Sequence, residues 1–201
     1  MDYFAGLDVS MQETHICVVD AEGGVVHEAR AATAPDAIAA RLKKAPPCRR
    51  VVLETGRMSP PLYHGLRALG VPALCIESRQ AHQALKTLAT HKTDRNDARG
   101  LAQLARTGFC KPVHVKSLAA HAVRALIGAR SKLIGQRVML ENQIRGLAVV
   151  YGVRLPRARS RDVVVGTLKA SDGIDGLAAA LRGLVAARSA IISAVVASTP
   201  I

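Results

Sequence analysis

The sequence predicts an α/β domain with a mixed sheet and flanking helices, followed by a segment built around one long helix. Short β-branched and alternating apolar runs fill the first third of the 201-residue chain, then alternate with helical stretches, and almost vanish after residue 93. Hydrophobic residues make up 49% of the chain and charged residues 21%, so the chain can bury a core. This composition favours a folded domain over a disordered chain.

The first predicted strands form an antiparallel meander. They cover residues 3–9, 14–20 and 25–32. Ser10-Met11-Gln12 separates the first two, and Glu22-Gly23-Gly24, a hairpin signal, separates the second from the third. Connections this short join strands that run in opposite directions.

Helices and strands alternate after the meander. Prolines at positions 35 and 60–61 begin two helices, and Gly70 ends the second of them. The predicted helices cover 35–44, 59–69 and 79–89, and the strands between them cover 50–54 and 71–76. Such alternation implies parallel strands. A three-stranded meander followed by alternating helices and strands is the order of the ribonuclease H-like fold.

The second half of the chain is predicted to be helical. Residues 94–106 form one helix, and residues 117–151 form the longest. Leucines recur every seven residues in this long helix, at Leu126, Leu133, Leu140 and Leu147. That spacing holds one face against a partner helix, as in a coiled coil, and a second copy of the chain as the partner would make a homo-oligomer. We therefore divide the chain into a domain of residues 1–110, a long basic amphipathic helix of residues 115–152, and a basic loop and helical linker of residues 153–201.

Positive charge is concentrated in the second half. Residues 1–100 contain 13 basic and 11 acidic residues, whereas residues 101–201 contain 15 basic and 4 acidic residues. This excess favours contact with nucleic acid, where arginines and lysines hold phosphates without reading bases. The candidate nucleic-acid-binding residues are Lys92, Arg95, Arg124, Arg130, Arg137, Arg145, Arg154 and Arg157. The alternative is the solvated face of an ordinary packing helix.

Other classes of protein are disfavoured. No signal peptide opens the chain, and Arg182 and Arg188 interrupt the most apolar stretch, so we expect a cytoplasmic protein with no membrane span. The four cysteines form no Cys-x-x-Cys pair and are expected to act as small buried residues. Aromatic residues make up 2% of the chain, which disfavours stacking on bases. The histidines that match no ligand motif are His82, His91, His114 and His121.

Four acidic residues stand out by their surroundings. Asp8 lies in an apolar strand and Glu54 ends another, where a carboxylate is costly unless positive charge meets it. Asp94 and Asp97 are three residues apart, which places both on one face of a helical turn. Converging carboxylates could bind two hard divalent cations through oxygen and support phosphodiester displacement. Taken separately, each residue has another explanation, as a turn, capping or helix-terminus residue.

Four segments together resemble one family. They are GLDVS (residues 6–10), VVLETG (51–56), KTDRNDARGLAQLARTG (92–108) and RALIGARSKLIGQRVMLENQIRGLAVVYGV (124–153). The set resembles the DEDD-type transposases of bacterial insertion sequences, the insertion sequence one-ten family, which includes the pilin-gene invertases. The resemblance spans roughly residues 3 to 155 and is more specific than any single motif.

This resemblance implies a RuvC-like, ribonuclease H-type domain whose Asp, Glu, Asp, Asp tetrad holds divalent metal, Mg²⁺ or Mn²⁺. Matched motif by motif, the catalytic and metal-binding roles fall on Asp8, Glu54, Asp94 and Asp97. The resemblance also implies DNA of an insertion element and of its target as partners, together with a structured guide RNA that pairs with both.

The family carries a further, C-terminal domain with a serine proposed as the nucleophile, for which this sequence shows no counterpart. We therefore expect the front part of a larger transposase or site-specific recombinase, not fully active by itself. The alternative is an inactive remnant that acts as a dimeric nucleic-acid-binding module. An actin-like or sugar-kinase-type ATPase is disfavoured, because that fold needs a second nucleotide-clasping domain.

Overall fold

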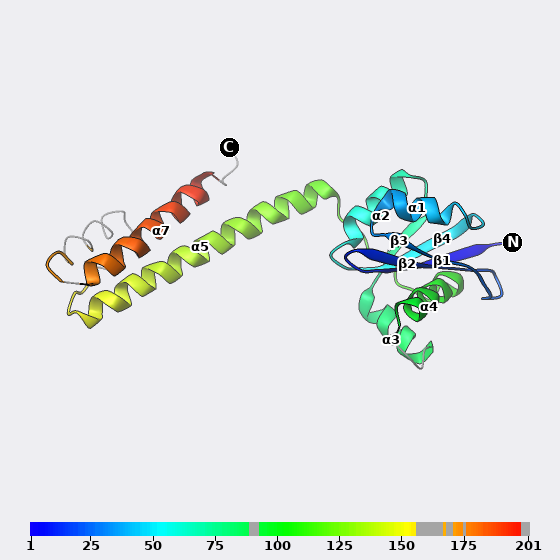
Figure 1. Ribbon diagram of the computed structural model, residues 1–201, viewed down its shortest axis with the longest axis horizontal. Coiled ribbons are helices and arrows are strands. Elements are labelled where there is room, and N and C mark those ends of the chain that lie inside the picture. Colours follow the sequence, from blue (N-terminus) through cyan, green and yellow to red (C-terminus); the bar gives the residue numbers. More distant parts are fainter. Residues whose placement is uncertain (89–92, 156–166, 168–170, 175, 198–201) are drawn as a thin grey trace. The chain divides into compact units, whose positions relative to one another are not determined.

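The computed structural model of the protein describes residues 1–88, 93–155, 167, 171–174 and 176–197 (Figure 1). The chain divides into two compact units, Met1–Leu118 and Ala119–Ile201. The first unit holds the sheet and the second holds almost all of the long helix, and each unit has a hydrophobic core of its own.

The first unit contains a five-stranded mixed sheet with the strand order β3-β2-β1-β4-β5. Its strands are β1 (Tyr3–Val9), β2 (Glu13–Val19), β3 (Val25–Ala32), β4 (Cys48–Glu54) and β5 (Ala73–Ile76). β1, β2 and β3 pair antiparallel, whereas β4 pairs with β1, and β5 with β4, in parallel. The predicted meander and the predicted parallel strands are therefore confirmed, and the fold is a ribonuclease H-like α/β fold.

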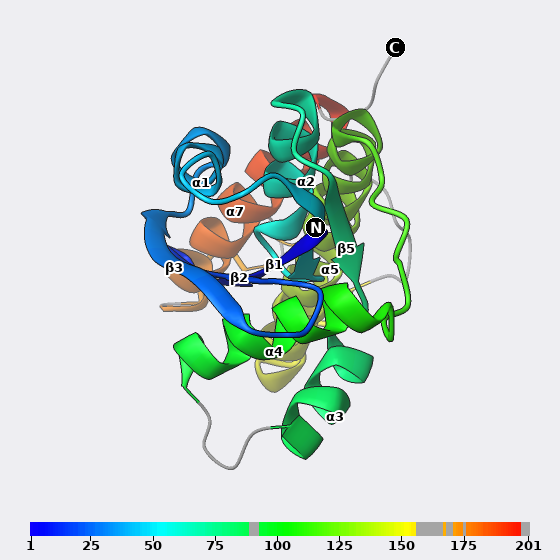
Figure 2. The same ribbon diagram turned by 90° about the vertical axis from the view of Figure 1, so that its right-hand side faces the viewer.

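Helices cover both faces of the sheet (Figure 2). They are α1 (Pro35–Leu42), α2 (Ser59–Ala68), α3 (Ser78–Leu88) and α4 (Asp94–Thr107). Leu7 of β1 and Leu53 of β4 are buried under α1 and α2, whereas Phe4 and Val52 of the same strands are buried under α4. Because side chains alternate along a strand, the even-numbered residues from Phe4 in β1 and from Arg50 in β4 face α4, after a register shift at the start of this strand pair.

A glycine in β1 lets α4 lie directly on the sheet. A Cβ atom at Gly6 would lie 2.2 Å from the carbonyl oxygen of Ala98 and 2.3 Å from the amide nitrogen of Ala102. No side chain fits between the two backbones, so the first turns of α4 are held close to the second half of β1.

Local signals set both ends of α4. The Thr93 hydroxyl accepts a hydrogen bond from the amide of Asn96 at 3.2 Å, which satisfies a donor that the helix itself leaves unpaired. Gly108 ends the helix with a left-handed conformation, at a φ of 73°. The cap at Thr93 places Asp94 and Asp97 in the first turn, where the helix dipole favours carboxylates.

The second unit is built from α5 (Leu118–Val150) and α7 (Leu177–Ala197). Ile144 of α5 packs in one cluster with Leu177, Leu181 and Val185 of α7. The repeating leucines are unequally covered in this chain, because Leu126 is 52% exposed while Leu133, Leu140 and Leu147 are half-buried.

A charged contact joins the two helices of this unit. Glu141, the sole acidic residue of α5, accepts hydrogen bonds from the guanidinium of Arg188 on α7, with the Arg188 Nε and Nη2 atoms at 2.9 and 2.8 Å from Oε1. Arg188 is 5% exposed, so both the charge and its partner lie within the helical pair. The pair therefore joins α5 to α7 through a largely buried charge.

α7 is the one described helix that is long and apolar enough to cross a membrane, judged by length and composition alone. The sequence prediction of no membrane span rests on Arg182 and Arg188, which interrupt this helix. Arg188 binds α5, so we interpret α7 as a packing helix of the second unit.

Candidate metal and nucleic-acid site

Two of the predicted carboxylates stand side by side at one edge of the sheet. Leu7 of β1 is paired with Leu53 of the parallel strand β4, so the next residues, Asp8 and Glu54, occupy neighbouring positions. Both follow a leucine that points to α1 and α2, which directs both carboxylates to the face that α4 covers. They line a hollow of about 390 Å³ together with residues of the loops that follow the two strands. The structure therefore brings Asp8 and Glu54 together.

The other two carboxylates belong to the first turn of α4, over the same face of the sheet. Ala98 packs against Gly6 of β1, so Asp97, one residue earlier, lies near the sheet and is half-buried. Asp94 lies one turn further out, with its side chain 72% exposed, and its Oδ2 atom is 3.8 Å from Nε2 of His15. His15 is paired with Asp8 in the register of β1 and β2, which places Asp94 over the same face as Asp8.

These carboxylates have the chemistry of a divalent-metal site. Carboxylate oxygens are the ligands that Mg²⁺ prefers, and Mn²⁺ accepts the same donors. In the part of the chain that the structure describes, no three Asp, Glu, His or Cys side chains meet closely enough to hold an ion. Four carboxylates repel one another without a cation between them. The four carboxylates are thus the right donors for a divalent metal and share one face of the sheet, although the described side chains do not converge on one point.

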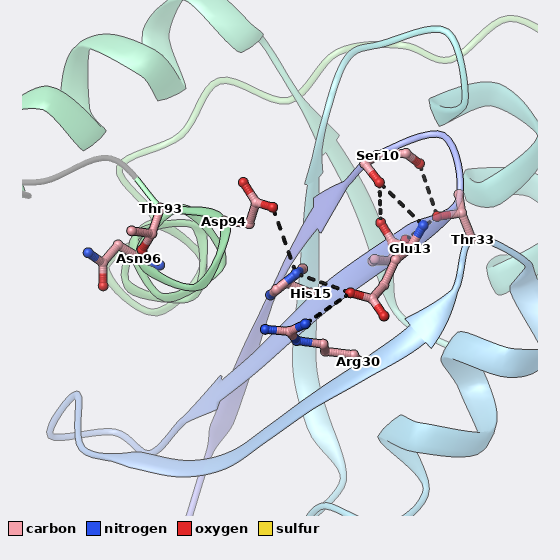
Figure 3. Close-up of polar contacts among 9 residues, drawn as sticks. Ser10, Glu13, His15, Arg30, Thr33, Thr93, Asp94 and Asn96 are labelled. Carbon is pink, nitrogen blue, oxygen red and sulfur yellow. Dashed lines mark hydrogen bonds and ion pairs between the residues drawn. The ribbon is translucent and has the colours of Figure 1, made fainter.

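A histidine with no role in the predicted site links the sheet to α4 (Figure 3). The side chain of His15 is 14% exposed, and its Nε2 atom lies 3.4 Å from Oε1 of Glu13 and 3.8 Å from Oδ2 of Asp94. Arg30 of β3 reaches the same Glu13 oxygen with Nη1 at 3.4 Å. Alternation along the predicted strand could have found His15, since it shares a face with the buried Cys17 and Val19.

Arg95, a predicted nucleic-acid contact, is paired with a carboxylate on β3. Its Nε atom lies 3.0 Å from both oxygens of Glu28. The hydrogen bond from Arg95 lowers the pKa of the Glu28 carboxyl below its ordinary value and raises the pKa of Arg95. Both residues line a pocket of about 270 Å³ between β2, β3 and α4, which also includes His15 and Arg30.

The cysteines carry no chemistry at this site. All four are free thiols, with Cys17 and Cys75 buried and Cys48 and Cys110 half-buried. Burial raises the pKa of Cys17, which lines the same pocket as Arg95, to about 11. Its thiol therefore stays protonated at neutral pH and is a poor nucleophile.

The remaining candidate nucleic-acid residues differ in their exposure. Arg124 and Arg130 on α5 are exposed, as is Arg154 beyond its end. Arg137 is half-buried, with its Nε atom 3.7 Å from the Glu141 carboxylate, and Arg145 is also half-buried. Lys92 and Arg157 lie outside the described residues, as does His91.

Comparison with known proteins identifies the family of this chain. The family model DEDD_Tnp_IS110, described as a transposase, matches residues 5–151. The transposase for insertion sequence element IS1111A of Coxiella burnetii (strain RSA 493 / Nine Mile phase I) is 29% identical over 157 residues. That match covers 78% of this chain and 41% of the relative, so the chain spans about two fifths of its length.

Among solved structures, T. thermophilus RuvC in complex with a Holliday junction substrate matches with a TM-score of 0.41 and 18% identity, over 56% of this chain and all of that one. The family match covers far more than half of the chain and contains all four carboxylates. The protein therefore belongs to the IS110 family of DEDD transposases.

Proposed function

We propose that this chain supplies the nuclease-like part of a transposase or site-specific recombinase, which acts in the bacterial cytoplasm on DNA of an insertion element and of its target. The observation that carries the proposal is the shared face of the four carboxylates. Asp8 and Glu54 lie at or next to the last residues of two neighbouring parallel strands, and the first turn of α4 lies over the same side of the sheet. That placement suits strand cleavage and transfer at a phosphodiester.

Asp8, Glu54, Asp94 and Asp97 would hold the metal, Mg²⁺ or Mn²⁺. When bound, a divalent ion neutralises charge on the phosphate and lowers the pKa of an attacking hydroxyl or water. The strand-borne pair Asp8 and Glu54 provides the fixed side of the site, because both side chains are anchored in the sheet. Asp94 and Asp97 lie in the first turn of α4, where the Asp94 side chain is 72% exposed and can adjust, while the half-buried Asp97 lies near the sheet.

The second unit is proposed to hold nucleic acid and a second copy of the chain. The exposed guanidiniums of Arg124, Arg130 and Arg154 supply charge that can contact phosphates. The same stretch of α5 exposes Ile127 by 65% and Leu126 by 52%, an apolar surface that self-association would cover. Phosphate contacts read no bases. Sequence choice would therefore come from elsewhere, and the family resemblance suggests a structured guide RNA that pairs with DNA.

One observation favours a second function. In the described ranges, no three ligand-type side chains meet closely enough to hold an ion. An inactive remnant that dimerises and binds nucleic acid would share this feature. The two proposals differ in whether the chain takes up metal at its carboxylates.

Metal uptake by the full 201-residue chain tests this difference. We expect calorimetric titration to show Mn²⁺ binding that Asp8→Asn or Glu54→Gln removes, because either change takes an anionic oxygen from the fixed side of the site. Asp36→Asn, at an exposed aspartate in the first turn of α1, is the matched control and should leave binding unchanged. Equal Mn²⁺ binding by Asp8→Asn and wild type would refute the metal site, and no binding by any form would favour the remnant.

A further inference from the structure

We propose that His15 is a positioning residue for Asp94, and that Glu13 and Arg30 hold the imidazole in place. This inference rests on the proposed function, in which Asp94 is a metal ligand. His15 would act through the carboxylate and would not touch the metal or the nucleic acid itself.

The position of His15 follows from the register of the sheet. His15 lies directly opposite Asp8 in the antiparallel pair of β1 and β2, so both side chains are on the face that α4 covers. The imidazole is 14% exposed and occupies the gap between the sheet and the start of α4. In the region that the structure describes, it is the side chain of the sheet that makes an ion-pair contact with Asp94.

The contacts favour hydrogen on one of the two ring nitrogens. Nε2 faces Oε1 of Glu13 at 3.4 Å and Oδ2 of Asp94 at 3.8 Å, and both of these atoms are acceptors. A lone pair on Nε2 would face two carboxylates, so this placement favours the tautomer that carries hydrogen on Nε2. At 3.8 Å the contact with Asp94 is longer than a hydrogen bond, so it is an electrostatic contact between the imidazole and the carboxylate.

Arg30 also contacts the Glu13 carboxylate. Its Nη1 atom lies 3.4 Å from the same Glu13 oxygen that faces His15, so the guanidinium offsets part of the negative charge on Glu13. Glu13 then orients the imidazole, and the same Nε2 atom of His15 can still interact with Asp94. Nitrogen and carboxylate groups alternate from β3 to the first turn of α4, in the order Arg30, Glu13, His15 and Asp94 (Figure 3).

Asp94 needs such a partner more than the other carboxylates do. Its side chain is 72% exposed, so several rotamers are open to it in solution and ordering it for a metal costs entropy. The imidazole, 3.8 Å from Oδ2, restricts those rotamers without covering Oδ1. Ligating carboxylates are commonly held by such outer polar partners, and losing one weakens metal binding about 10- to 100-fold.

The test measures Mn²⁺ binding to the full chain by electron paramagnetic resonance of the free ion. We expect His15→Ala to weaken binding about 10- to 100-fold, and His15→Gln, which keeps an N–H donor, to recover part of the loss. His114→Ala, at an exposed histidine with no ion-pair contact to Asp94, is the control. Circular dichroism and urea midpoints show whether each variant is folded.

A second measurement needs no metal. Long-range ¹H–¹⁵N spectra of the full chain should show His15 with hydrogen on Nε2, and Asp94→Asn or Arg30→Ala should shift its ring signals while those of His114 stay in place. Unshifted His15 signals in Asp94→Asn, or unchanged Mn²⁺ affinity in a folded His15→Ala, would overturn the role of His15 alone. A wild-type chain that binds no Mn²⁺ overturns the metal site and the role of His15 together.

Discussion

Gly6 shows how much of the site depends on one missing side chain. The residue lies in the middle of β1, two positions before Asp8, and its backbone meets the backbone of α4. The sequence shows a glycine two positions before a carboxylate, as Gly6-Leu7-Asp8. The role of this glycine in packing cannot be predicted from the sequence, because the sequence does not say which helix will cover the strand.

Replacing this glycine tests the packing of α4 on β1 directly. Gly6→Ala is expected to lower the free energy of unfolding by about 1–3 kcal/mol, at the upper end of that range, since the atoms in the way are backbone atoms of α4 that cannot rotate aside. Urea denaturation followed by circular dichroism measures the change. Gly56→Ala is a suitable control, because a Cβ atom there meets nothing within 4 Å. Equal losses in the two variants would show that α4 does not lie on β1 as described.

Among single residues, the positions set by the alternation of side chains along a strand could be predicted. The contacts that depend on how α4 packs on the sheet could not. Asp8 and Glu54 follow from parallel strands that end together. The contact of Asp94 with His15 and that of Arg95 with Glu28 join residues far apart in the sequence, on elements whose relative placement is decided by the packing of α4. The sequence shows that Arg95 is one of the basic residues predicted to contact nucleic acid. It does not show that Arg95 pairs with Glu28, because that contact depends on the folded arrangement of α4 and β3.

At the scale of elements, the long helix α5 contacts α7 in two ways, through an apolar cluster and through an ion pair. The heptad leucines predict one apolar face, and part of that face is occupied by α7 within the same chain. Glu141 stands out in the sequence as the sole acid among basic residues of this helix, but Arg188 is 47 residues away and its burial could not be foreseen. Periodicity gives the face of a helix, whereas the partner depends on how the chain folds back.

The ion pair between these helices gives a prediction for the second unit. Glu141→Ala would leave Arg188, which is 5% exposed, as a buried charge without its carboxylate. We expect a loss of about 3 kcal/mol in the free energy of unfolding, the lower end for a broken buried pair because the Glu141 side chain is 22% exposed. Urea denaturation measures the total loss of stability, and faster amide hydrogen exchange in α7 would show that the loss occurs in this helix.

Two further variants make that prediction specific. Arg182→Ala removes an exposed arginine from the same helix and should cost little. The double change Glu141→Met with Arg188→Leu replaces both charges by apolar groups and should be less costly than Glu141→Ala. If Glu141→Ala unfolds at the same urea concentration as Arg182→Ala, the buried pair does not hold α5 to α7.

For the molecule as a whole, charge and chemistry are divided between the two units. The carboxylates proposed to hold metal are all in the first unit, and the exposed arginines of α5 are in the second. The uneven charge along the sequence is consistent with this proposed division, because 11 of the 15 acidic residues lie within residues 1–100. Strand bounds were also close, with β2 beginning at Glu13 and β5 at Ala73 in place of residues 14 and 71.

Nucleic-acid binding by the second unit should be dominated by electrostatic attraction to phosphates. We expect gel-shift affinity for double-stranded DNA to fall steeply as salt rises. In Arg124→Ala and Arg130→Ala, the slope of log K against log salt should become shallower by about 0.9 for each phosphate that the removed guanidinium had neutralised. Arg41→Ala with Lys43→Ala, two exposed basic residues of the first unit, is the charge-matched control. Binding that does not change with salt would contradict both proposed functions.

The close approach of Gly6 to α4 has a consequence for how the site tolerates change. At this point the separation of β1 and α4 is set by their main-chain atoms, with no side chain between them. Exchanges of core side chains elsewhere therefore need not alter this separation, whereas a side chain at position 6 must. A series of larger residues at position 6 would act as spacers of graded thickness, and would show at what separation the two pairs of carboxylates can no longer share an ion.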